Sequence, residues 1–168
     1  MKKTLLGIVG MMMTAISVFA DFTPPTAEQL TAAANNPTAM AALLVGASSE
    51  QAAQVIKAVV VQISAMGLSA SAQAASIGSV ITVSFSAVPA GAAPMLAANL
   101  GTACGSSLAI SANPVVVSSI QSSIATAGGS GGATMAQTFG TSYTEAKAAS
   151  QGAKDSAPPV AKGYDGQQ

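Results

Sequence analysis

The sequence predicts an all-α protein, a small bundle of short, Ala-rich helices. Half of the 168 residues are hydrophobic, alanine is the commonest of them, and only 4% are aromatic. Such a composition lets helix axes come close but supplies little buried area per residue. Residues 49–66 repeat apolar side chains at helical spacing. The pairs Asn36-Pro37 and Asn113-Pro114 each match a helix start, with Asn as N-cap and Pro in the first turn.

Residues 1–20 have the pattern of a bacterial secretory signal peptide. Two lysines precede an apolar run over residues 5–19, and Val18 and Ala20 occupy the −3 and −1 positions of a cleavage site. The alternative is an uncleaved membrane anchor, but the run is short for a spanning helix of about 20 residues. Because Asp21 and not Cys follows, a lipid anchor is not indicated. We therefore expect an exported protein that is periplasmic, cell-envelope-associated or secreted.

Two short helices are expected before the central one. Residues 21–25 contain two prolines and should be extended, and Thr26 is an N-cap for a helix that ends at Asn36. Asn36 and Pro37 then start a second helix. Its large apolar residues, on one face, are Met40, Leu43 and Leu44.

The clearest helix covers residues 49–66. Ser48 and Gln51 have the spacing of a capping box, and Glu50 places a negative charge in the first turn. Gly67 is suited to the position after the last turn. The helix carries one apolar face, which needs a tertiary partner and consists of Ala52, Val55, Ile56, Val59, Val60 and Ile63.

Residues 69–88 fit two structures. Val80–Ala87 alternates apolar and polar side chains, which is the period of a β-strand. A lone strand would have no partner, whereas a helix would align one continuous apolar stripe. We therefore predict a helix and keep the strand as the alternative; the stripe consists of Ala70, Ala74, Ile77, Ile81, Phe85 and Val88.

Two further helices are predicted, from Pro94 to Ile110 and from Pro114 to Ala127. Gly128–Gly132 is interpreted as a flexible linker because it contains four glycines and a serine. After Tyr143 the chain becomes polar and is expected to be disordered. The predicted organisation is a signal peptide (1–20), a helical domain (21–127), a Gly-rich linker with a short segment (128–144) and a disordered tail (145–168).

The composition excludes most catalytic chemistry. The chain has no His and no Arg, so the usual general base and the commonest metal ligand are missing. The six carboxylates left after cleavage are scattered, and a Ser-Lys pair through Lys57 is disfavoured because this lysine lies on the polar face of its helix. We therefore predict no enzyme and no catalytic, cofactor-binding or metal-binding residues.

Cys104 is the only cysteine, so no internal disulfide can form. We expect it to be a small buried apolar residue, with an intermolecular disulfide as the alternative. Gly101 and Gly105 have the small-xxx-small spacing that allows two helices to approach closely.

The charge pattern indicates a protein that acts by contact. No charged side chain occurs between Lys57 and Glu145, and the processed chain carries four lysines against six acids. Nothing attracts nucleic acid. An uncharged surface opposes association only weakly, so we expect protein binding or self-assembly, with a homo-oligomer or an envelope protein as partner. Insertion of the uncharged middle into lipid is the less favoured alternative, and a hydrolase with a base other than His is third.

Overall fold

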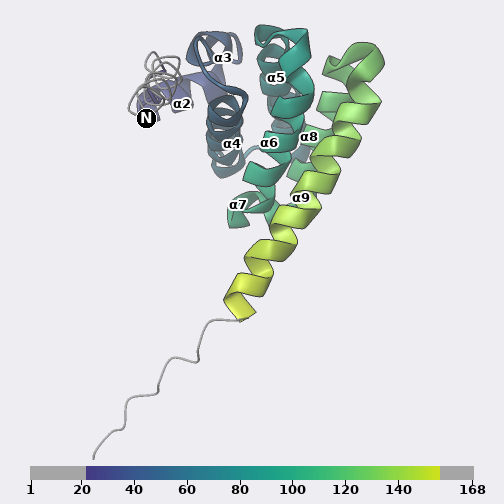
Figure 1. The fold of residues 1–168 in the computed structure, drawn as a ribbon. Helices are drawn as coiled ribbons and strands as arrows, with labels where there is room; N and C mark the ends of the chain where they lie inside the picture. Colours follow the sequence, from purple (N-terminus) through teal and green to yellow (C-terminus); the bar gives the residue numbers. More distant parts are fainter. Residues whose placement is uncertain (1–21, 156–168) are drawn as a thin grey trace, which may run out of the picture.

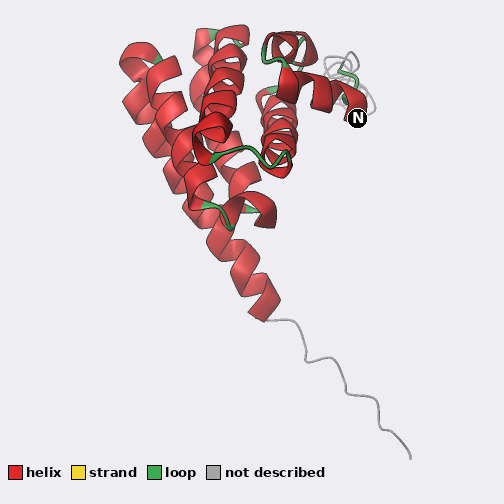
Figure 2. Ribbon diagram, turned by 180° about the vertical axis from the view of Figure 1, so that it is seen from behind, coloured by secondary structure: helices red, strands yellow, loops and turns green. Residues whose placement is uncertain are grey.

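The computed structural model describes residues 22–155, and every regular element in that range is helical. The all-α prediction is confirmed, and Val80–Ala87 lies inside a helix, so the alternative strand does not form. Figures 1 and 2 show the helices from two opposite sides. The helices are α2 (Ala27–Asn35), α3 (Thr38–Leu43), α4 (Ser49–Ala65), α5 (Ala70–Ala87), α6 (Ala93–Gly105), α7 (Leu108–Ser111), α8 (Pro114–Ala127) and α9 (Gly132–Asp155), with 3₁₀ turns η2 (Ala90–Ala92) and η3 (Gly129–Gly131).

The helices form two rows. In the first row α2 packs on α4, α4 on α6 and α6 on α9; in the second α3 packs on α5 and α5 on α8. The array runs across Figure 1 from α2 at one side to α9 at the other. The chain therefore alternates between the two rows, and each helix packs on the next helix of its own row, as stacked helix pairs do in repeat proteins.

The central helix α4 begins as the sequence predicts. The Ser48 hydroxyl accepts a hydrogen bond from the Gln51 backbone N–H at 3.2 Å, and the Ser48 backbone N–H donates to the Gln51 side chain at 2.9 Å. At the other end Gly67 has a φ of 66°, a value that favours glycine. The predicted apolar face is buried in full, together with Ala53.

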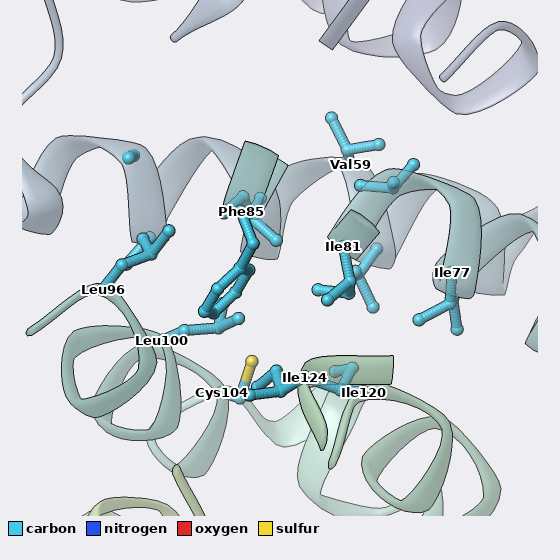
Figure 3. Close-up of a cluster of buried hydrophobic side chains, with 14 of the residues drawn as sticks. Val59, Ile77, Ile81, Phe85, Leu96, Leu100, Cys104, Ile120 and Ile124 are labelled. Atoms are coloured by element: carbon cyan, nitrogen blue, oxygen red, sulfur yellow. The ribbon is translucent and has the colours of Figure 1, made fainter. Parts of the chain in front are cut away.

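The main core lies between the two rows. Each fully buried Ile or Leu contributes roughly 1.5–3 kcal/mol relative to exposure. Figure 3 shows that large apolar side chains of four helices converge there. They are Val59 of α4, Ile77, Ile81 and Phe85 of α5, Leu96, Leu100 and Cys104 of α6, and Ile120 and Ile124 of α8.

The predicted linker and tail are wrong over residues 128–155. Gly129–Gly131 is a tight 3₁₀ turn, and Gly132 lies so close to α8 that a Cβ atom there would be 2.8 Å from the Ala125 carbonyl carbon. These glycines allow the backbones of α8 and α9 to approach closely, and their role is not to make the segment flexible. Residues 132–155 then form one helix, α9, whose Phe139 is fully buried. The rest of the predicted tail, 156–168, and the predicted signal peptide lie outside the described residues.

Two glycines of α6 let α9 pack directly on its backbone. A Cβ atom at Gly101 would overlap the Phe139 carbonyl oxygen and lie 2.9 Å from the Ser142 Cβ atom. One at Gly105 would overlap the Tyr143 carbonyl oxygen and lie 2.9 Å from the Ala146 Cβ atom. The small-xxx-small spacing therefore marks a real helix contact within the protein.

Candidate contact surface

The single thiol is buried and has low reactivity. Cys104 is 0% exposed in the core of the bundle, as predicted. Burial raises the pKa of its thiol from the ordinary 9.0 to about 12, and the positive charge of Lys57 on the neighbouring helix α4 lowers this pKa only in part. The Lys57 ammonium donates a 2.6 Å hydrogen bond to the side chain of Gln54 on its own helix. The pair therefore offers no thiolate nucleophile at neutral pH.

We predict that Cys104 is protected by the fold. At pH 8 a thiol reagent should label it slowly in the native protein and at once in denaturant. The folded state keeps a proton that the unfolded chain releases above pH 9, so stability should be complete below pH 9 and fall between pH 9 and about 12. The difference between the unfolded and folded pKa values of this thiol corresponds to roughly 4 kcal/mol of folding free energy. Equal labelling of native and unfolded protein would contradict the buried position.

No group of three or more His, Cys, Asp or Glu side chains in residues 22–155 could hold a metal ion. The hydrogen bond of Lys57 goes to Gln54, so the structure does not assemble the disfavoured Ser-Lys pair there.

The surface hydroxyl groups are largely turned back onto their own helices. On α5 the hydroxyls of Ser79, Thr82 and Ser86 donate to the carbonyl four residues earlier at 2.9–3.1 Å. On α8 the hydroxyls of Ser118 and Ser122 donate to the carbonyl three residues earlier at 3.0 and 3.1 Å. Because each donor already has a partner, covering this surface leaves few donors unsatisfied. Desolvating such a surface therefore costs little free energy.

A wide groove of about 830 Å³ runs between α8 and α9. Its floor contains Gly140, where a Cβ atom would lie 3.2 Å from the Gln121 amide nitrogen. The same Gln121 nitrogen donates a 3.3 Å hydrogen bond across the groove to the Ala136 carbonyl. Thr141 and Glu145 line the α9 side. Apart from Glu145 the lining carries no formal charge.

This groove lies at the end of the helical array. In the second row α8 follows α5 and is the last helix of that row among residues 22–155, while α9, which also packs against α8, ends the first row. Figure 2 shows α9 at the edge of the array, with its last turns beyond the other helices. The groove therefore occupies the place that one more helix of the second row would fill.

The C-terminal half of α9 is held by Lys147. Its ammonium donates a 3.3 Å hydrogen bond to the Ser111 carbonyl at the end of α7 and lies 5.8 Å from the centroid of the Tyr143 ring. The Tyr143 ring in turn stacks on Phe139, with 6.1 Å between centroids. These contacts fix the α9 wall of the groove.

Within residues 22–155 no single helix is long and apolar enough to cross a bilayer. Helix α5 reaches that length and composition only together with the segment Ala90–Gly105, and the two are bent by 118°.

No protein-family model, no curated protein and no solved structure matches the chain. The sequence does not predict this groove, because the composition of residues 128–144 indicates a linker and a short segment. The spacing of Met135, Phe139 and Tyr143 at intervals of four is the signal that could have revealed α9.

Proposed function

We propose that the chain is an exported, non-enzymatic protein that works by contact with other protein chains, through self-assembly or an envelope partner. The observation that carries the proposal is the groove between α8 and α9, at the open end of the second row. Its proposed occupant is an uncharged helix of another chain, including a second copy of this one, since the groove between two neighbouring helices is where a third helix packs.

The charge pattern supports the same proposal. Helices α5, α6, α7 and α8 carry no charged side chain, and most hydroxyls of α5 and α8 donate to the backbone of their own helix. Association of such surfaces meets little electrostatic repulsion and little cost from unpaired donors. Exposed apolar side chains add buried area on contact; they include Val45, Met95, Leu108 and Val115.

Insertion into lipid is the second candidate, favoured only by the bent pair of apolar helices. The large side chains of that pair, among them Ile77, Ile81 and Leu100, lie inside the bundle, so insertion would require the core to open. Flotation of the processed chain with phosphatidylcholine–phosphatidylglycerol vesicles separates the two candidates. Recovery in the floating fraction would favour insertion.

A charge placed in the groove tests the contact proposal. Thr141→Glu puts a second carboxylate into the lining, one turn from Glu145, and Thr102→Glu puts the same charge on the exposed side of α6 as a matched control. We expect Thr141→Glu to weaken self-association, or cross-linking to an envelope protein, about tenfold or more because an unpaired desolvated charge is costly. The control should behave as wild type. Equal effects of the two variants, or a strictly monomeric wild type with no cross-linked partner, would contradict the proposal.

A further inference from the structure

A second cavity lies at the end of the bundle where α9 begins, uppermost in Figure 1. There the turn between α5 and α6 faces the turn between α8 and α9, and both line an open pocket of about 470 Å³. This volume lies within the range of about 300–1,000 Å³ that is usual for small-molecule sites. The pocket is distinct from the α8–α9 groove, with which it shares no lining residue.

The lining is apolar and adaptable. The nearly buried Phe85 comes from α5, Ala90 from the first turn and Met135 from α9. The Met135 methyl group folds back against the turn between α8 and α9, because a Cβ atom at Gly128 would overlap it. An unbranched thioether chain can change rotamer to fit different shapes, and the glycine leaves it the room to do so.

The polar groups of the pocket are few and neutral. Thr134 and Thr138 line it. The Thr138 hydroxyl donates to the Thr134 carbonyl at 3.0 Å, so toward a ligand the hydroxyl oxygen of Thr138 acts mainly as an acceptor. No charged side chain lines the pocket. Pro94, in the first turn of α6, has no N–H, so this helix end has one donor fewer for an anion.

We propose that this pocket binds a neutral, mainly apolar small molecule, such as a ring system or a short aliphatic chain with at most one or two polar atoms. The inference goes beyond the contact function and does not depend on it. Apolar burial supplies the binding free energy, and the absence of charge in the lining selects against ionised ligands.

The test uses N-phenyl-1-naphthylamine, a neutral dye whose fluorescence rises in apolar surroundings. Processed wild-type protein should bind the dye saturably with one site per chain. Thr134→Phe and Ala90→Phe fill the pocket from opposite lips, both at exposed positions, and should each raise the dissociation constant about tenfold or more. Thr102→Phe adds the same ring outside the pocket and should leave the constant unchanged.

Circular dichroism and thermal unfolding of each variant show that the fold is kept. The proposal is overturned if the dye does not bind saturably, or if both filling variants bind it as the wild type does. Loss of self-association in Thr134→Phe without any dye binding would also overturn it, because the pocket would then accept a side chain of another protein. Failure of the Thr141→Glu test alone concerns only the contact function.

Discussion

Replacement of Phe139 by alanine is expected to lower the free energy of unfolding by about 3–5 kcal/mol. Phe139 is fully buried and stacks on Tyr143, so truncation removes a large apolar side chain and leaves a cavity between α9 and the rest of the bundle. Whole domains are stable by only about 5–15 kcal/mol. The change should therefore lower the melting temperature by on the order of 10 °C.

Thr141→Ala is the matched control, because it truncates an exposed side chain of the same helix. Its effect should stay within about 0.5 kcal/mol. Chemical denaturation followed by circular dichroism measures both variants. If Phe139→Ala unfolds at the same denaturant concentration as the control, α9 is a detachable tail and the sequence-based division at residue 128 would be restored.

The double substitution Gly101→Ala and Gly105→Ala is expected to destabilise the protein by on the order of 3 kcal/mol, the cost of overpacking at two sites. Alanine is the better helix former by about 1 kcal/mol per site, so propensity alone predicts the opposite sign. Packing should dominate, because the new methyl groups meet the backbone of α9 and no rotamer change can relieve that clash.

Gly91→Ala serves as the control for this pair, since nothing lies within 4 Å of a Cβ atom at that position. Thermal unfolding should show a lower midpoint for the double variant and an unchanged one for the control. A double variant that melts higher than wild type would show that α6 and α9 do not approach as closely as described.

Local rules predicted much of the fold. Capping and helix-start signals placed α2, α4, α6 and α8, and the continuous apolar stripe of residues 70–88 correctly favoured a helix over Val80–Ala87. In each case the residues that decide the structure are neighbours along the chain. The burial of Cys104 also followed from its uncharged sequence surroundings.

Helix α9 and the groove could not be predicted in this way. The glycines before α9 have the composition of a linker, and only the contact of Gly132 with the Ala125 backbone shows that they form a tight packed turn. In the sequence Lys147 is one of several charges in a polar stretch. Nothing local indicates that it contacts Ser111, which lies 36 residues earlier. These features depend on contacts between segments that are far apart in the sequence, and no local sequence pattern predicts such contacts.

Sedimentation velocity of the processed chain, over a range of protein concentrations and at low and high salt, tests the contact function most directly. An interface almost free of charge predicts reversible association that grows with concentration and persists as salt rises from about 0.05 to 1 M, because screening acts only on charged groups. A monomer at every concentration that also cross-links to no envelope protein, or oligomers that dissociate as salt is added, would contradict the account.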